Sequence, residues 1–169
     1  MHKVHVLFGF SFGSGSKDPG MVNKVTAQAI LKLNLLFQDN AGSRPLIATQ
    51  WEVDNAMSQS GDLRADLRVC IPDGKTYIDT RYTARRMIAL LSSVKSVSPD
   101  NICAHIVAHP RHIGRCATNL TACGVQEIAL HPIRELYDPD DPQEHVRSRK
   151  SFMVHERYAV VYDYLRNMF

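Results

Sequence analysis

Short apolar runs alternate with segments of helical spacing along the chain, and this alternation restricts the possible folds more than any other feature. The runs are bounded by residues that break helices and strands, and they lie at Val4–Phe8, Pro45–Thr49, Leu67–Ile71, Ile102–Val107 and Ile128–Leu130. Nearly continuous apolar runs of this length are typical of strands that are buried on both faces of a sheet. We therefore predict a strand at each of them.

Between the runs, apolar residues recur at intervals of three and four, as on one face of a helix. The pattern is clear in segments that contain Val25, Ala29, Leu33 and Leu36, then Ala84, Ile88 and Leu91, and then Cys116, Leu120 and Cys123. It is weaker between Val53 and Leu63, where we predict a short helix. A last helix, from about Ser151 to Met168, carries a stripe that we expect to pack on the sheet, formed by Phe152, His155, Tyr158, Ala159, Tyr162 and Leu165.

Strands that alternate with helices, joined by connections too long for hairpins, predict a parallel sheet with right-handed crossovers. We expect one α/β domain over residues 1–169, with an open, mostly parallel five-stranded sheet and helices on both faces, as in Rossmann-like proteins. Ligands of such sheets bind beyond the carboxyl ends of the strands, where the strand order reverses. The loops that follow the strands are therefore the candidate site.

The composition is that of an ordinary globular protein, with 44% hydrophobic and 22% charged residues among 169. A domain of this length buries roughly 70% of the surface of its unfolded chain, so its core needs no metal or disulfide. The net charge of +3 comes from basic and acidic residues that are interspersed, which argues against a nucleic-acid partner.

The cellular location is predicted from the cysteines and the apolar segments. Cys70 and Cys103 lie in apolar runs, where a reduced cysteine packs as a small hydrophobic residue. No stretch approaches the roughly 20 apolar residues of a membrane span, and the N-terminus lacks the features of a signal peptide. We expect a protein of the reducing cytoplasm that does not enter a membrane.

The loop after the first predicted strand is rich in glycine and serine, and it leads toward a helix. Backbone amides in such a loop can cradle an anion, so we consider a ligand contact by Gly9, Ser11, Gly13 and Ser14. The loop does not match the dinucleotide fingerprint or the Walker motif. A plain flexible loop is an equal alternative, because glycine and serine are ordinary loop residues.

Two polar side chains follow the second predicted strand. Gln50 and Glu52 lie where a carboxylate either binds a ligand hydroxyl or caps the next helix. Position in the sequence does not decide between these two roles.

The densest group of chemically capable side chains is found around the end of the fourth predicted strand, at His105, His109, Arg111, His112 and Arg115. His105 alternates with apolar residues inside the strand, which predicts a core histidine. The others follow the strand, where cations and imidazoles suit an anionic or carbonyl-bearing ligand. We expect His112 and Arg115 to face the same cleft as Glu52, with Arg115 holding an anionic part of the ligand.

A zinc site drawn from this region is not favoured by the spacing. The candidate ligands, which are Cys103, His105, His109, His112 and Cys116, straddle a strand, a turn and a helix. They lack the paired spacing that sets ligands on one side of an ion. We therefore predict no metal. The sequence also holds no nucleophile elbow of a hydrolase.

Several motifs resemble those of the YdcF/SanA-like family, a Rossmann-like group. Val6–Gly9 resembles its opening strand and glycine, and Ile47–Val53 is similar to its Ser-Gly-Gly-x-Glu-Ala signature, with Glu52 on the glutamate. Thr80–Ala84 resembles Thr-x-Glu-Asn-Ala. The most specific match is Val107–Cys116, which resembles Val-Thr-Ser-x-x-His-x-x-Arg-Ala, with His112 and Arg115 on its histidine and arginine. The segment from 156 to 165 is similar to the closing segment of the family.

The resemblance implies a ligand pocket that includes Gln50, Thr80 and Thr83, and a nucleotide-like ligand such as S-adenosylmethionine. Thr83 and Tyr82 stand where the family has asparagine and glutamate, and Thr49 and Gln50 replace two glycines.

Two functions agree with these residues. The first is a small-molecule binding protein or enzyme with a nucleotide-like or anionic ligand. As an enzyme it would use His112 as general acid or base, Arg115 to stabilise negative charge and Glu52 to orient a hydroxyl. The alternative is a non-catalytic adaptor that keeps the fold and binds a protein partner, in which the replaced motif residues mark a lost pocket.

Overall fold

The computed structural model describes residues 3–13, 18–41, 43–61, 63–72 and 78–167, and the side chains of these ranges except at residues 41 and 159–167. Its five strands form one parallel sheet in the order β3-β2-β1-β4-β5. They are β1 (Val4–Gly9), β2 (Leu46–Gln50), β3 (Leu67–Val69), β4 (Ile102–Ala108) and β5 (Glu127–Pro132). The predicted α/β class with an open parallel sheet is confirmed.

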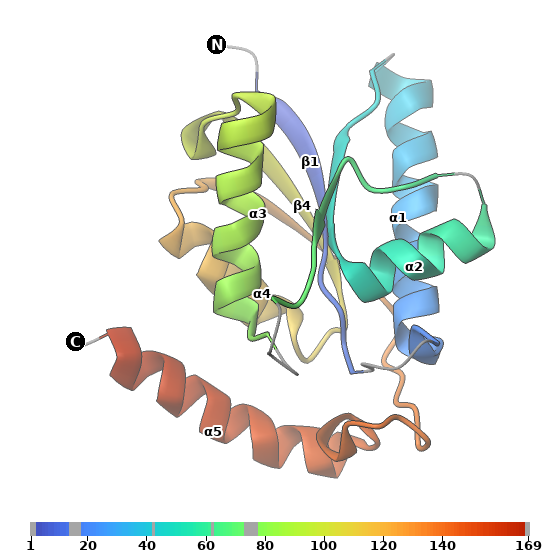
Figure 1. Ribbon diagram of the computed structural model, residues 1–169, viewed down its shortest axis with the longest axis vertical. Helices are drawn as coiled ribbons and strands as arrows, with labels where there is room; N and C mark the ends of the chain where they lie inside the picture. Colours follow the sequence, from blue (N-terminus) through green and yellow to red (C-terminus); the bar gives the residue numbers. More distant parts are fainter. Residues whose placement is uncertain (1–2, 14–17, 42, 62, 73–77, 168–169) are drawn as a thin grey trace.

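Helices cover both faces of the sheet (Figure 1). One face carries α1 (Gly20–Ala41) and α2 (Trp51–Ser60), and the other carries α3 (Thr80–Lys95) and α4 (Ile113–Ala122). Side chains alternate across a strand, so successive residues of β1 pack against the two helix layers in turn. Leu7 packs in the core under α1 and α2, whereas Val6 and Phe8 pack in the core under α3 and α4. Burial on both sides explains why the strand sequences are apolar throughout.

The strand order reverses between β1 and β4. From β1 the chain crosses to β2 and then β3 on one side, and afterwards returns to β4 and β5 on the other side. The loops that leave β1 and β4 therefore diverge at their carboxyl ends, which is the place where such sheets bind ligands. No loop separates β2 from α2, since α2 begins at Trp51, directly after the strand and two residues before the predicted start of this helix. Glu52 thus lies in the first turn of α2.

The last helix, α5 (Arg149–Asn167), differs from the prediction. It runs across the carboxyl ends of the strands instead of along a face of the sheet (Figure 1). Phe152 is buried there against Phe12 of the loop after β1, whereas Tyr158 is 74% exposed. Ala159, Tyr162 and Leu165 of the predicted stripe lie outside the residues with described side chains, and Met168 lies outside the described residues. A helical stripe predicts that a helix packs, but not where.

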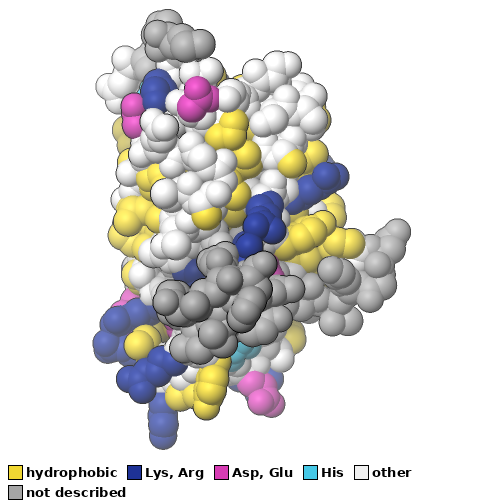
Figure 2. Space-filling model, turned by 90° about the vertical axis from the view of Figure 1, so that its left-hand side faces the viewer, with side chains coloured by type: hydrophobic (Ala, Val, Ile, Leu, Met, Phe, Trp, Pro, Cys, Tyr) yellow, Lys and Arg dark blue, Asp and Glu magenta, His cyan; other side chains and the backbone are white. Residues whose placement is uncertain are grey.

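The described surface is mixed in character. Among the described residues, no helix combines the length and the apolar composition needed to cross a bilayer. On the face seen in Figure 2, hydrophobic, basic and acidic side chains occur in separate small groups. The exposed large hydrophobic residues include Leu36, Val94 and Leu130, which lie on three different elements.

Candidate functional site

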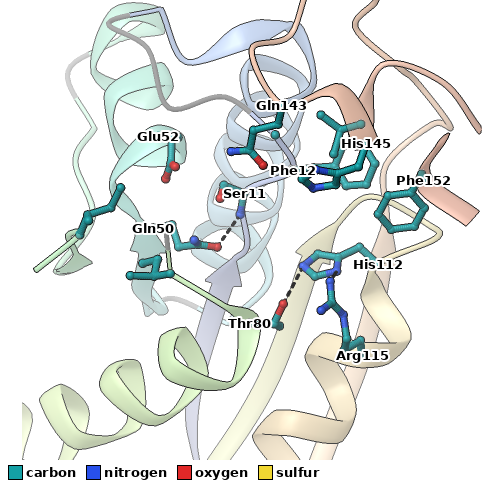
Figure 3. Close-up of a pocket in the computed structure, with 14 residues that line it drawn as sticks. Ser11, Phe12, Gln50, Glu52, Thr80, His112, Arg115, Gln143, His145 and Phe152 are labelled. Carbon is teal, nitrogen blue, oxygen red and sulfur yellow. Dashed lines mark hydrogen bonds between the residues drawn. The ribbon is translucent and has the colours of Figure 1, made fainter. Parts of the chain in front are cut away.

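A cavity lies at the carboxyl end of the sheet, under the segment that leads into α5 (Figure 3). It has a volume of about 540 Å³, which includes its part open to solvent. We call it the strand-end cavity. It is lined by Ser11, Phe12, Gly13, Gln50, Glu52, Ile71, Ile78, Thr80, His112, Arg115, Gln143, His145, Val146 and Phe152.

The loop after β1 is held in place by its backbone amides. The amide of Ser11 donates to Gln50 Oε1 at 2.9 Å, and that of Phe12 donates to Asn23 Oδ1 at 2.9 Å. The amide of Phe10 donates to the carbonyl of Val107. These three N–H groups are therefore not available to an anion. This differs from the anion-binding role that the sequence suggested for the loop. Gln50 instead fixes the loop to the end of β2.

Gly13 allows this loop to lie close to the C-terminal segment. Its φ is 76°, in the left-handed region that favours glycine. A Cβ atom at this position would lie 2.5 Å from Asp141 Oδ2 and 2.5 Å from Val146 Cγ2. The absence of a side chain at Gly13 thus allows the loop and the C-terminal segment to close the wall of the cavity.

Glu52 brings a carboxyl group into the cavity from the first turn of α2. The residue is only 5% exposed, and its Oε2 has no hydrogen-bond partner among the described residues. Burial raises the pKa of Glu52 to about 7, although hydrogen bonds from its own amide and from Ser11 act in the opposite direction. The first-turn position fits the predicted capping role, but the free oxygen is what a ligand-binding carboxylate would present.

Thr80, His112 and Arg115 form a hydrogen-bonded chain on the opposite wall (Figure 3). Thr80 begins α3, and His112 and Arg115 belong to the turn and first residues of α4. The distance from Arg115 Nη2 to His112 Nδ1 is 3.2 Å, and that from His112 Nε2 to Thr80 Oγ1 is 3.4 Å. A guanidinium can only donate, so Nδ1 accepts and the proton of neutral His112 resides on Nε2. That N–H points toward Thr80 at the edge of the cavity.

Electrostatics keeps the imidazole of His112 neutral. The pKa of His112 lies well below its usual value because the ring is buried, and the nearby charge of Arg115 lowers it further. The predicted approach of His112 and Arg115 to the cleft of Glu52 is present in this geometry, since all three line the same cavity.

Arg115 also has a partner that the sequence did not indicate. Its Nε lies 3.1 Å from Glu156 Oε1 on α5, and the two side chains are only 12% and 15% exposed. The guanidinium charge is therefore largely compensated inside the protein. An anionic ligand would share Arg115 with Glu156 instead of meeting a free cation.

The roof of the cavity comes from the segment before and within α5, which the sequence analysis did not assign to the site. It contributes Gln143, His145, Val146 and Phe152. The ring of His145 stacks on that of His155 with centroids 4.0 Å apart, and burial lowers the pKa of His145 to about 4. No local sequence motif predicts that these residues line a cavity. Their place depends on the path of α5 across the strand ends.

Two predicted ligand residues are structural in the described chain. Gly9 ends β1 beneath the helices, where an added Cβ would come within 2.7 Å of Ile30 and 2.8 Å of Thr49. Thr83 is buried in α3 and donates to the carbonyl of Asp79 at 3.0 Å. Neither lines the strand-end cavity. Ser14, the remaining candidate of the first loop, lies outside the described residues.

His109 and Arg111 also stay out of the cavity. His109 is fully buried and stacks on Phe12 with ring centroids 3.9 Å apart. It donates from Nε2 to the carbonyl of Leu136 at 2.9 Å, and its Nδ1 accepts from the amide of Arg111 at 3.2 Å. Arg111 reaches outward to Glu135 at 3.2 Å. His109 is thus the satisfied core histidine of this turn.

Comparisons with known proteins add no family to this description. No protein-family model, no curated protein and no solved structure matches the chain.

Proposed function

We propose that this protein binds a small ligand in the strand-end cavity, with a donor group of the ligand at Glu52 and an anionic or carbonyl oxygen at the opposite wall. The observation that carries the proposal is the buried Oε2 of Glu52, which lacks a hydrogen-bond partner among the described residues. Leaving a buried acceptor unpaired costs about 1–3 kcal/mol. A ligand hydroxyl or amine at this oxygen would recover that energy.

The opposite wall supports an acceptor group of the ligand. The hydroxyl of Thr80 accepts from the Nε2–H of His112 and keeps its own proton to donate to a ligand, and Arg115 places positive charge behind them. Because His112 has a strongly lowered pKa, it serves better as a neutral hydrogen-bond donor than as the general acid or base expected from the sequence. With a pKa of about 7, Glu52 is the better proton-transfer group at neutral pH. Any turnover would therefore use Glu52 as acid or base.

The size of the cavity limits the part of the ligand that is enclosed. The volume of about 540 Å³ includes the part open to solvent, so we expect only one polar end of the ligand, such as a phosphate or carboxylate, to be enclosed. The rest of a nucleotide-like ligand would extend through the open side. The resemblance to the YdcF/SanA-like family favours this class, with S-adenosylmethionine as one candidate.

The proposal includes the cellular compartment of the protein and the class of its partner. All four cysteines are free, which is usual in a reducing compartment such as the cytoplasm. Basic and acidic residues are nearly balanced, 20 against 17, and on the face seen in Figure 2 they form small separate groups. We therefore expect the partner to be a small molecule and not a nucleic acid or a membrane.

A thermal-shift screen tests the proposal. The probes are S-adenosylmethionine, AMP, glucose 6-phosphate and inorganic phosphate, applied to the wild type, to Glu52→Gln and to the exposed control Glu144→Gln. A ligand at 100 times its Kd adds about 2.7 kcal/mol and raises Tm. We expect at least one probe to stabilise the wild type and the control but not Glu52→Gln. No shift with any probe contradicts the proposal and favours a non-catalytic adaptor.

A further inference from the structure

A second group of chemically capable side chains lies on the sheet itself, far from the strand-end cavity. His5 of β1 is the register partner of Cys103 of β4, and His105 follows Cys103 by two residues. Register partners and residues two apart project from the same face of a parallel sheet. All three side chains therefore emerge on the face that carries α1.

The donor atoms of these side chains converge. His5 Nδ1 lies 3.0 Å from His105 Nε2, and Cys103 Sγ lies 3.8 Å from the same nitrogen. All three donor atoms lie within 4.8 Å of one another. A tetrahedral zinc ion with Zn–N of about 2.0–2.1 Å and Zn–S of about 2.3 Å holds its ligand atoms roughly 3.3–3.6 Å apart. The observed separations bracket this range.

We propose that His5, Cys103 and His105 form a binding site for Zn²⁺, with the fourth position left to solvent. Imidazole and thiolate ligands in a tetrahedral arrangement select zinc over Mg²⁺ and Ca²⁺, which prefer oxygen ligands. His5 reaches the surface, whereas Cys103 and His105 are half-buried, so the ion has a path to the site.

The surroundings hold the ligands in orientation. His105 Nδ1 lies 3.1 Å from His131 Nε2, and with the proton of His105 on Nδ1 its Nε2 accepts from His5 Nδ1. Both of these nitrogens would offer lone pairs to the ion once His5 takes its other tautomer, with the proton on Nε2. Phe37 of α1 packs against the rings of His5 and His105, with centroids 5.1 Å and 4.8 Å away. A hydrogen bond from the outer ring nitrogen, here toward His131, fixes the orientation of a metal-binding imidazole.

A coordinating cysteine binds as the thiolate, so binding of the ion would displace the thiol proton of Cys103.

Spacing within one segment of the sequence does not reveal this cluster. His5 is separated from His105 by 100 residues, and only the pairing of β1 with β4 brings them together. The site is independent of the proposed ligand in the strand-end cavity, which lies beyond the opposite end of β1.

Cobalt titration of the untagged, metal-free protein tests the site. Tetrahedral Co²⁺ with a thiolate ligand gives visible d–d bands and a near-ultraviolet charge-transfer band. We expect these bands to saturate at one equivalent and to disappear when Zn²⁺ is added. Cys103→Ser should lose the charge-transfer band, whereas Cys123→Ser, at a half-buried cysteine outside the cluster, should keep it.

Two further variants keep the test decisive if Cys103→Ser does not fold. His5→Gln changes the most exposed ligand, and it should fold normally by circular dichroism yet lose stoichiometric binding. His131→Asn should keep the bands but weaken binding by about 10- to 100-fold, as expected for an outer group. Absence of stoichiometric binding by the wild type, or unchanged binding in His5→Gln, would show a hydrogen-bonded row of histidines only and would overturn the proposal.

Discussion

Glu52 is the residue on which the functional proposal rests, because its buried carboxyl group has one oxygen without a partner among the described residues. Its pKa is raised from 4.5 to about 7 by burial. In this interval the folded protein holds the proton more tightly than the unfolded chain does. The free energy of unfolding therefore falls as the pH rises from about 4.5 to 7.

Replacement of Glu52 by glutamine should remove this pH-dependent cost. Raising the pKa of Glu52 from 4.5 to about 7 corresponds to about 3 kcal/mol. We expect Glu52→Gln and the wild type to be similarly stable at pH 4, and the variant to be more stable by up to about 3 kcal/mol at pH 8, as measured by urea denaturation. The exposed control Glu144→Gln should show no such trend. A stability difference that is constant with pH would refute the role of burial at Glu52.

The ion pair between Arg115 and Glu156 gives a second prediction for individual residues. Removing one partner of a largely buried pair leaves an uncompensated charge, and we expect Arg115→Ala and Glu156→Gln each to cost about 3 kcal/mol, the lower end of the usual range. The double variant should cost clearly less than the sum of the two single changes. Additive losses in urea denaturation would mean that the two side chains are not coupled.

The sequence indicated residue types at the strand-end cavity better than their electrostatic states. His112 and Arg115 were predicted from their positions after a strand, and Glu52 and Thr80 with the help of the family resemblance. All four line one cavity. The neutral state of His112 could not be predicted, because it depends on burial. The pairing of Arg115 could not be predicted either, because its partner lies on a helix whose path is set by packing.

At the scale of elements, β1 lies so close to its neighbours at Gly9 that the position has no room for a side chain. An added Cβ would meet Ile30 and Thr49 at under 3 Å, so we expect Gly9→Ala to destabilise the protein by about 1–3 kcal/mol through overpacking. Gly114 is the matched control, because a Cβ there meets no atom within 4 Å and the residue lies in α4. Gly114→Ala should stabilise by up to about 1 kcal/mol. Equal effects of the two changes in thermal unfolding would contradict this assignment.

Phe152 anchors α5 over the strand-end cavity. Its ring packs 4.8 Å from that of Phe12, and it is almost fully buried. Phe152→Ala should cost about 3–5 kcal/mol and open the roof of the cavity. Val154, which is 54% exposed on the same helix, is the control, and Val154→Ala should change little. A small loss of Tm in Phe152→Ala would show that α5 is not held by this contact.

The elements themselves illustrate what periodicity can and cannot predict. Strand and helix types follow from apolar runs and helical spacing, because local geometry determines which side chains share a face. The predicted position of the last helix was wrong, since its apolar stripe fits a sheet face and a strand-end surface equally well. The roof residues Gln143 and His145 were missed for the same reason.

At the scale of the whole molecule, the order β3-β2-β1-β4-β5 creates the site. The reversal between β1 and β4 opens the space between their loops, and α5 then covers that space with an element from the far end of the described chain. Alternation of strands and helices predicts a parallel sheet, but the order of its strands depends on contacts between segments distant in sequence. The site is therefore a product of long-range assembly.

The most direct test of the ligand-binding proposal is a two-dimensional ¹H–¹⁵N NMR titration of the protein with the probes of the thermal-shift screen. We expect at least one probe to shift the amide signals of Ser11, Glu52, Thr80 and His112 in a saturable way, and Glu52→Gln to abolish the effect. Amides at the other end of the sheet, such as that of His5, should not move. Saturable shifts that avoid the strand-end cavity, or none with any probe, would contradict the account.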